Sequence, residues 1–366
     1  MKYYLIAGES SGDHYGGLLM KELKDIDPEA EFCFWGGDKM LEQSSNQDMS
    51  IKETSFMGLW IVLKNIFKIL GFFNKAKSNI REFDPNLLIL IDYPGFNLRM
   101  LKWAHRNGIK TCNIISPQIW AWRKYRYKVL RDYADLFYIV LPFEQEIYDE
   151  LGVSYEYHGH PILDIHSSVP ETRPLNYEIQ TIGLFPGSRR QEITKTLGIF
   201  LEYARSHKEY NFLISKVAHI DDSVYSDLIK DSDDNVKLET NLKNIYKEID
   251  LAIACSGTIS LELCILLIPQ IVVYKASTIS FKLAKALVKA PYISLVNLIA
   301  KRELVKELIQ NDLNSKSIAN QVDEISSLVS RNEMLEAYKN VRSKLGEGQA
   351  IKKISKSIYR NIADPI

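Results

Sequence analysis

The sequence predicts an α/β protein made of two Rossmann-like domains that face each other across a cleft. Short apolar runs alternate with amphipathic stretches in the first half of the chain, and a second series of the same kind follows a proline-rich break. Near-continuous apolar strands separated by helices are typical of a parallel sheet covered on both faces. A chain of 366 residues also has room for two hydrophobic cores.

The first domain is expected at residues 1–165, with helices that begin near His14 and Asn97. Its strands are expected at 3–7, 87–91, 109–115 and 136–141, and one more is expected to end at Trp35, Gly36 and Gly37. Between Pro161 and Tyr177 the periodicity fails and three prolines punctuate a polar segment, which indicates a linker.

The second domain is expected at residues 166–345, with strands at 181–185, 211–214, 236–239, 251–254 and 271–274. Gly346 and Gly348 mark a break before a final helix from about Ala350. We expect this C-terminal segment, 346–366, to pack back on the N-terminal domain. Because open α/β sheets bind ligands at the carboxyl ends of their strands, the strand-to-helix turns are the places to look for function.

Composition excludes several classes of protein. Lys and Arg together number 46, as do Asp and Glu, so no global field favours nucleic acid as a partner. The four cysteines are far apart in apolar surroundings, which argues against a disulfide framework or a zinc site and favours a reducing cytosol. We find neither a signal peptide pattern nor a run near the roughly 20 apolar residues that span a bilayer.

Two turns in the second half suit a phosphate. In PGSRRQEI, residues 186–193, Gly187 allows close approach of the backbone, Ser188 can cap the helix, and Arg189 or Arg190 supplies charge. In CSGTISLE, residues 255–262, small residues precede a helix, and a carboxylate suits a ribose hydroxyl pair. The residues concerned are Ser256, Gly257, Thr258 and Glu262. In both turns an ordinary capped helix start remains the alternative.

The first turn of the chain, GESSGDHYGG, does not fit the G-x-G-x-x-G dinucleotide fingerprint, and the chain contains no P-loop. A nicotinamide enzyme is therefore disfavoured, and no cofactor is expected. The turn suits a sugar or a phosphate on the acceptor side of a reaction, through Glu9, Ser10, Ser11, Gly12 and Asp13.

Asp92 follows the apolar run 87–91 directly and precedes Tyr93, Pro94, Gly95 and Phe96. A carboxylate at a strand end, in partly apolar company, is placed to act as a general base. The alternative is that Asp92 only caps the helix expected at Asn97.

The segment SPQIWAWRKYRYKVLR, residues 116–131, combines tryptophans with cations and suits an anionic acceptor or anionic lipid headgroups. A solvated amphipathic helix is the alternative. Residues 56–77 predict an interfacial helix that dips into a leaflet or receives acyl chains, with a buried core helix as the alternative. Its apolar residues include Met57, Leu59, Trp60, Leu63, Phe67 and Leu70.

No essential metal is expected. His158 and His160 have no third ligand at metal spacing, and no D-x-D follows a strand. Cationic side chains and helix termini would then stabilise a leaving diphosphate.

An ordered set of motifs resembles the lipid-A-disaccharide synthase family. It spans about Ala7 to Gln310 and comprises AGESSGD, MGL, IDYPGFN, SPQIWAW, PFE, GHP, PGSRRQEI, SGTISLE, VVYK, LVNLIA and LVKELIQ. The resemblance implies a GT-B glycosyltransferase at the bacterial inner leaflet. It implies inverting transfer from UDP-2,3-diacylglucosamine to 2,3-diacylglucosamine 1-phosphate (lipid X), which gives a β-1,6 linkage and UDP.

By motif, the resemblance implies that Asp92 is the base for the acceptor 6-hydroxyl. UDP-side residues would be Ser188, Arg189, Ser256, Gly257, Thr258, Glu262, Asn297 and Glu307, and further acceptor-side residues Asn97, Trp122 and Arg123. It also implies a cytoplasmic protein at the inner-membrane surface, with a homodimer as one assembly that it allows. The chain has Gly95 where the family often has a second acidic residue, which strengthens the case for Asp92 alone.

Two other functions remain open on the sequence. One is another GT-B enzyme that acts on UDP-N-acetylglucosamine, such as an epimerase or a cell-wall transferase. The other is a non-catalytic, membrane-associated nucleotide sensor, which would bind UDP without turnover.

Overall fold

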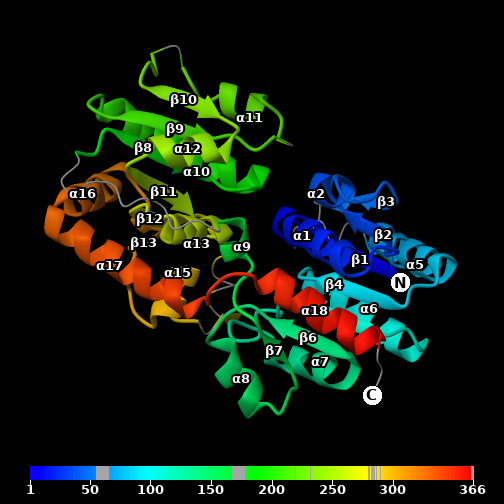
Figure 1. Cartoon of the computed structure of the whole chain (residues 1–366). Coiled ribbons are helices and arrows are strands. Elements are labelled where there is room, and N and C mark those ends of the chain that lie inside the picture. Colours follow the sequence, from blue (N-terminus) through cyan, green and yellow to red (C-terminus); the bar gives the residue numbers. More distant parts are fainter. Residues whose placement is uncertain are drawn as a thin grey trace. The chain divides into compact units, whose positions relative to one another are not determined.

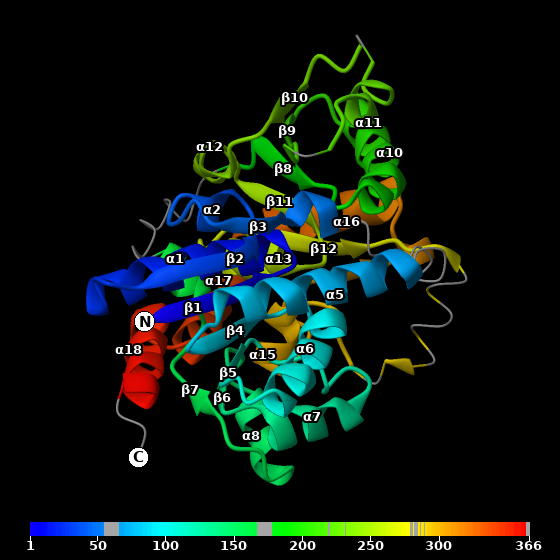
Figure 2. The same cartoon turned by 90° about the vertical axis from the view of Figure 1, so that its right-hand side faces the viewer.

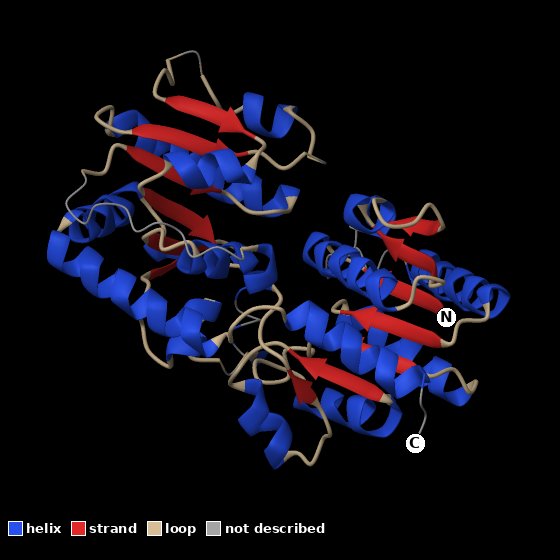
Figure 3. Cartoon of the chain, viewed as in Figure 1, coloured by secondary structure: helices blue, strands red, loops and turns tan. Residues whose placement is uncertain are grey.

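The computed structural model describes residues 1–54, 66–166, 178–218, 220–230, 232–278, 281, 285, 287–288 and 290–363. These residues form two compact units (Figure 1). Unit 1 comprises Met1–Ile165 and Leu345–Ile366, and unit 2 comprises His166–Lys344. In each unit a parallel sheet lies between helices (Figure 3), so the expected α/β class with two parallel sheets is confirmed.

The sheet of unit 1 has seven strands in the order β3-β2-β1-β4-β5-β6-β7. They are β1 (Lys2–Ala7), β2 (Glu31–Gly36), β3 (Gln47–Ser50), β4 (Leu87–Ile91), β5 (Thr111–Ile114), β6 (Leu136–Ile139) and β7 (Glu156–Tyr157). Every residue of the central strand β4 is buried, as expected for a parallel strand covered on both faces.

Helices cover both faces of this sheet. One face carries α1 (Ser10–Ile26) and α18 (Ala350–Ala363), which pack side by side (Figure 1). The other carries α5 (Ile66–Phe83), α6 (Pro94–Arg106) and α7 (Tyr127–Tyr133) (Figure 2). The remaining elements are α2 (Asp38–Leu41), α3 (Ile51–Thr54), the 3-10 helix η1 (Lys124–Arg126), α8 (Glu144–Glu150) and α9 (Ile162–Ile165).

Specific polar contacts hold the C-terminal helix α18 against the N-terminal part of unit 1. The Asp164 carboxylate accepts hydrogen bonds from the first amides of the helix, those of Ala350 and Ile351, at 3.1 and 2.7 Å. Further along, the Ser357 hydroxyl joins Tyr138 and Glu156. The apolar side of α18 completes the core under α1.

The sheet of unit 2 has six strands in the order β10-β9-β8-β11-β12-β13. They are β8 (Thr181–Phe185), β9 (Asn211–Ser215), β10 (Val236–Glu239), β11 (Leu251–Cys255), β12 (Gln270–Tyr274) and β13 (Glu307–Ile309). The helices are α10 (Arg190–Ser206), α11 (Ser223–Ser226), α12 (Leu242–Glu248), α13 (Thr258–Ile265), α15 (Leu295–Ala300), η2 (Gln310–Asp312), α16 (Ser315–Ser326) and α17 (Leu328–Lys344). One core lies under α10 and α16, and another under α12 and α13.

Three strands have the bounds expected from sequence. They are the central strands β4 and β8 and the edge strand β10. Three strands were not expected: β3, β7 and β13, each of which lies at the edge of its sheet. Edge strands are short and lack the continuous apolar run that marks a buried strand. Among the described residues, no helix is long and apolar enough to cross a membrane.

Candidate active site

The strand order locates the candidate site in each unit. In unit 1 the order reverses between β1 and β4, where Ala7 pairs with Ile91. In unit 2 it reverses between β8 and β11, where Phe185 pairs with Ala254. Such switch points, at the carboxyl ends of the strands, are where open α/β sheets bind ligands. The turns singled out from sequence follow these four strands.

Asp92, the proposed base, sits on strained backbone. Asp92 and Tyr93 have φ values of 49° and 54°, in the left-handed region that residues other than glycine rarely adopt. Strain of this kind persists only where the surroundings impose it, and it gathers at functional sites. The Asp92 amide donates to the Ile114 carbonyl at 2.9 Å, and the side chain is half-buried.

Asn97, expected on the acceptor side, holds the backbone of this turn through its side-chain amide. The residue is fully buried, and its amide nitrogen donates to the carbonyls of Asp92 and Ile91 at 2.6 and 3.2 Å. It is therefore a positioning residue that holds the turn carrying Asp92. The helix begins at Pro94, with Tyr93 as its N-cap, so Asp92 does not cap it.

Glycine is required beside this turn. A Cβ atom on Gly8 would lie 2.2 Å from the Tyr93 ring, so only glycine allows the β1 and β4 turns to approach so closely. Burial, together with the negative charge of Glu9, raises the pKa of Tyr93 well above its usual range. Glu9 and Tyr93 therefore face the same small region next to Asp92.

The start of α1 carries the other residues expected on the acceptor side. The helix begins at Ser10 instead of near His14, with Ser10 exposed and Ser11 half-buried. Gly12 is buried against strand ends, where a Cβ would lie 3.3 Å from that of Ala7.

Asp13, expected on the acceptor side, binds backbone amides of unit 1. The side chain is 5% exposed. Its carboxylate oxygens accept hydrogen bonds from the amides of Gly37, Lys39 and Met40 at 2.6 to 3.1 Å. Asp13 thus accepts the hydrogen bonds of the free amides at the start of α2 and places a negative charge at that end of the helix.

The segment after β5 lies beside the Asp92 turn, because β4 and β5 are neighbours. Trp122 is half-buried and Arg123 is exposed, with the Arg123 guanidinium 4.3 Å from the centre of the indole ring. Ile115 and Arg123 have φ values of 71° and 52°. A positive φ is a marked outlier for a β-branched residue such as isoleucine, so strain extends along this edge of the sheet.

Glu144, from the PFE motif, anchors this segment, a role that sequence reasoning missed. It is 1% exposed, and its carboxyl accepts from the Trp120 indole and the Leu141 amide, both at 3.3 Å. Burial raises its pKa to about 8, which the hydrogen bonds only partly offset. No signal in the sequence separates such a carboxyl from the solvated ones around it.

In unit 2, the turn after β8 already holds a carboxylate where a phosphate was expected. The amides of Ser188 and Arg189 donate to Glu192 Oε2 at 3.0 and 3.3 Å. Arg189, not Ser188, is the N-cap of α10, which corrects the expected cap. Gly187, at φ 122°, leaves room for the Glu192 side chain. A phosphate at these amides would have to displace Glu192.

The turn after β11 presents the start of α13. Gly257 is exposed and Thr258 is half-buried at the first position of the helix. The Ser256 hydroxyl donates to the Ile293 carbonyl at 2.9 Å and so fixes a neighbouring loop. Burial raises the pKa of Cys255 to about 12, and the charges of Glu192 and Arg189 also act on it, which shows that the two turns lie close together.

Glu262 lies one turn into α13, as expected, but it has protein partners. Its carboxylate accepts a hydrogen bond from the Tyr246 hydroxyl at 2.5 Å, and the His166 ring nitrogen lies 4.0 Å away. Burial and the Glu262 charge raise the pKa of Tyr246 far above its usual range. Tyr246 was not expected from sequence, because its distance from Glu262 along the chain conceals the contact.

Glu307 and Asn297 act on the backbone. The Glu307 carboxylate accepts from the amides of Ile293 and Ser294 at 2.9 to 3.2 Å, and from the Asn297 side chain at 2.9 Å. Asn297 is fully buried and also accepts from the amides of Leu304 and Val305. These residues shape the loop that Ser256 contacts.

The expected interfacial helix falls largely outside the described residues. Met57, Leu59, Trp60 and Leu63 lie there, and the side chain of Phe67 is not described either. Leu70, on the described part of α5, is 52% exposed. Three residues further on, Phe73 is buried and stacks on Phe96 at 4.2 Å between ring centres.

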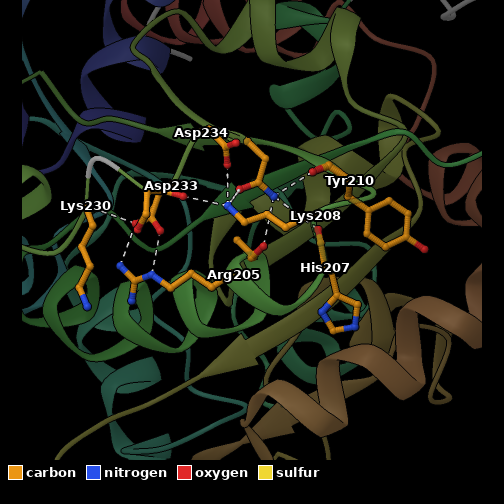
Figure 4. A network of polar contacts seen from close by, with 10 residues as sticks. Arg205, His207, Lys208, Tyr210, Lys230, Asp233 and Asp234 are labelled. Carbon is orange, nitrogen blue, oxygen red and sulfur yellow. Dashed lines mark hydrogen bonds and ion pairs between the residues drawn. The ribbon is translucent and has the colours of Figure 1, made fainter.

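A second polar cluster lies at the opposite edge of the unit 2 sheet, before β9 and β10 (Figure 4). Arg205 donates through two nitrogens to both oxygens of Asp233, each at 2.8 Å. Nearby, Lys208 contacts Asp234 at 2.6 Å. Because each cation has a carboxylate partner, this cluster stabilises the fold at the amino ends of the strands.

Fold and site together define a class. Solved structures with this fold include UDP-GlcNAc 2-epimerase from Neisseria meningitidis bound to UDP-GlcNAc, at TM-score 0.65 and 14% identity over 99% of this chain and 100% of that one. CalG4, the calicheamicin glycosyltransferase, matches at TM-score 0.61 and 13% identity over 99% of both chains. The protein therefore has the GT-B-type fold that glycosyltransferases and UDP-sugar epimerases share.

The family follows from the sequence comparisons. The model of the lipid-A-disaccharide synthetase family matches residues 3–362. A lipid-A-disaccharide synthase from Trichlorobacter lovleyi is 34% identical over 96% of this chain and 95% of its own length. The chain belongs to the lipid-A-disaccharide synthetase family, as the motifs indicated.

Proposed function

We propose that this chain is an inverting glycosyltransferase of lipid A synthesis that joins UDP-2,3-diacylglucosamine to 2,3-diacylglucosamine 1-phosphate. The products are a β-1,6-linked disaccharide 1-phosphate and UDP. Family membership over nearly the whole chain is the observation that carries this proposal. The geometry supports separate roles for the two units.

Unit 1 supplies the base. In an inverting transfer, one carboxylate takes the proton of the acceptor hydroxyl while the oxygen attacks the anomeric carbon and the diphosphate leaves. Asp92 is a half-buried carboxylate on a strained turn at the switch point of its sheet. No second carboxylate stands in the first turn of α6, where Gly95 is exposed.

Unit 2 supplies the donor groups. The start of α13 directs backbone amides toward an anion, and Arg189 adds a positive charge on the neighbouring turn. Glu262, half-buried with Tyr246 as its partner, suits the ribose hydroxyls. We propose Asn297 and Glu307 as positioning residues for the loop at Ile293, because both bind backbone groups there.

The outer surface of α5, α6 and α7 supports attachment to an anionic bilayer surface. Lys77 and Arg81 lie over the Trp103 ring at 5.9 and 5.3 Å, and Lys102 lies over Tyr133 at 5.5 Å. α6 contains no acidic residue. Cations next to amphipathic aromatic rings favour a headgroup layer, where the acylated substrates would reside.

Mass spectrometry of reactions with both acylated sugars tests the function. The wild type should form the disaccharide, and Asp92→Asn should lower the rate by about 10²- to 10⁴-fold, the usual contribution of a general base. UDP affinity, measured by calorimetry, should not change, because Asp92 belongs to unit 1.

Asp84→Asn is the matched control. Asp84 also has a positive φ, at 52°, but it precedes β4 at the amino edge of the sheet. This variant should keep full activity. Turnover of water-soluble UDP-N-acetylglucosamine without use of the acylated donor would replace the proposal with the epimerase alternative, and UDP binding without any turnover would indicate a sensor.

A further inference from the structure

Two arginines of unit 1 lie over one tryptophan, and the charge of a third also acts on one of them. Arg126 is 9% exposed, and its guanidinium lies 5.2 Å from the centre of the Trp122 ring, over which Arg123 also lies. Arg99 extends from α6 over the Phe73 ring at 5.6 Å. We call Arg99, Arg123 and Arg126 the three-arginine cluster.

The positive charge of the cluster is not neutralised within the part of the chain that the structure describes. No carboxylate there forms an ion pair with any of the three guanidinium groups. Burial, the charge of Arg123 and, more weakly, that of Arg99 lower the pKa of Arg126. A buried cation among like charges costs free energy, which a bound anion would recover.

The cluster lies at the carboxyl ends of the strands of the unit 1 sheet, as Asp92 does. Arg123 and Arg126 follow β5, whose last residue, Ile114, accepts the hydrogen bond of the Asp92 amide. Arg99 is on α6, the helix that starts directly after the Asp92 turn and packs against α7. An anion held by these arginines would therefore lie on the acceptor side of the reaction.

We propose that the three-arginine cluster binds a phosphate monoester that the acceptor sugar carries on C1. The inference rests on the proposed function: the 1-phosphate and the reacting 6-hydroxymethyl group are carried by C1 and C5, the two carbons that flank the ring oxygen, so a site for the phosphate would lie beside the base. Guanidinium groups suit phosphate because each donates two parallel hydrogen bonds to its oxygens. Stacking on Trp122 holds two of these groups in place before the ligand arrives.

Phospholipid headgroups offer the same phosphate chemistry, but two observations favour the acceptor. Arg126 is nine-tenths buried, whereas a planar layer of headgroups meets exposed cations. The cluster also adjoins the strained backbone at Asp92 and Ile115. Binding to vesicles is nevertheless a separate arm of the test.

The experiment compares two acceptors in detergent micelles, 2,3-diacylglucosamine with and without its 1-phosphate. The full-length variants are Arg99→Gln, Arg123→Gln and Arg126→Gln. Each should lower kcat/KM for the phosphorylated acceptor by about tenfold to a hundredfold, the usual worth of a charge-assisted hydrogen bond. With the unphosphorylated acceptor, kcat/KM should stay within about twofold of wild type.

Arg131→Gln is the matched control. Arg131 lies on α7, the helix that follows Arg126 directly, but pairs with Asp132 at 2.8 Å. This variant removes an equal charge and should leave the preference between acceptors unchanged. Arg99 and Arg123 are exposed, so their variants also test the idea if Arg126→Gln folds poorly.

Two outcomes would overturn the inference. One is an equal loss with both acceptors. The other is an unchanged preference between the two acceptors in variants that lose binding to phosphatidylglycerol vesicles relative to wild type but keep their binding to phosphatidylcholine vesicles, which would assign the cluster to lipid headgroups. If the wild type forms no disaccharide, the proposed function fails, and calorimetry with glucosamine 1-phosphate against glucosamine decides the inference. Phosphate-dependent binding that Arg126→Gln abolishes would uphold it, and no binding would reject it.

Discussion

Two arginines in this protein, one half-buried and one buried, have opposite electrostatic surroundings. Arg205, at the amino edge of the unit 2 sheet, shares two hydrogen bonds with Asp233, whose side chain is fully buried (Figure 4). Arg126, at the carboxyl edge of the unit 1 sheet, has Arg123 and Arg99 as charged neighbours. The comparison indicates that the arginine at the amino ends of the strands stabilises the fold through an ion pair. The arginine at the carboxyl ends is instead available to a ligand.

Removing Asp233, the partner of Arg205, should produce the largest change in the free energy of unfolding. Asp233→Ala removes the acceptor of three hydrogen bonds, from Arg205 and from the Lys230 amide. We expect the free energy of unfolding of unit 2 to fall by about 3 kcal/mol, since a part-buried charge loses its partner. Urea titration measures this. Asp234→Ala, at an exposed ion pair, should cost less than about 1 kcal/mol.

Glu144 provides a second comparison with Asp233, because its carboxyl is buried without a cation as partner. Its pKa is raised to about 8 from an ordinary 4.5, so between these pH values the folded chain holds a proton that the unfolded chain has lost. The free energy of unfolding should therefore fall as pH rises, by about 2 kcal/mol between pH 6 and 8. Unfolding at several pH values measures the slope. Glu144→Gln should flatten it, and an equal slope in the variant would contradict the assignment.

Removing the Arg126 charge should change the free energy of unfolding in the opposite direction to removing Asp233. Arg126→Met keeps most of the buried volume but removes a cation from among like charges. We expect the free energy of unfolding to stay constant or to rise by up to about 1 kcal/mol, while activity with the phosphorylated acceptor falls. Thermal unfolding in buffers with and without inorganic phosphate provides the check. A destabilisation as large as that of Asp233→Ala would show that Arg126 has a structural role like that of Arg205.

The smallest change in the free energy of unfolding is expected at Gly95, which lies three residues after Asp92 at the start of α6. A Cβ atom there would meet nothing within 4 Å, so Gly95→Asp fits without displacement. An acidic residue in the first turn of α6 should raise the free energy of unfolding by about 0.5 kcal/mol, through the helix dipole and the loss of glycine. Activity should remain, since Asp92 acts alone in the proposed mechanism. A large gain in kcat would show that a second carboxylate assists the base.

Local sequence was sufficient where a segment is buried on both sides. The runs that became β4 and β8 are continuously apolar, so their bounds could be read directly from the residues. The turns after these strands were located for the same reason. Helix starts were less accurate, because α6 begins after a left-handed Tyr93, a conformation that no local pattern indicated.

The sequence by itself determined two parallel sheets, the turns that would face a ligand and, through its ordered motifs, the family. Only the tertiary structure decided which polar residues in those turns are free for chemistry. Asp13 and Asn97 were expected as ligand contacts, and the fold also gives them backbone partners distant in the chain, the Gly37 amide and the Ile6 carbonyl. Apolar periodicity is a local property that sets the strands, whereas the partner of a polar side chain depends on which distant segments the fold brings beside it.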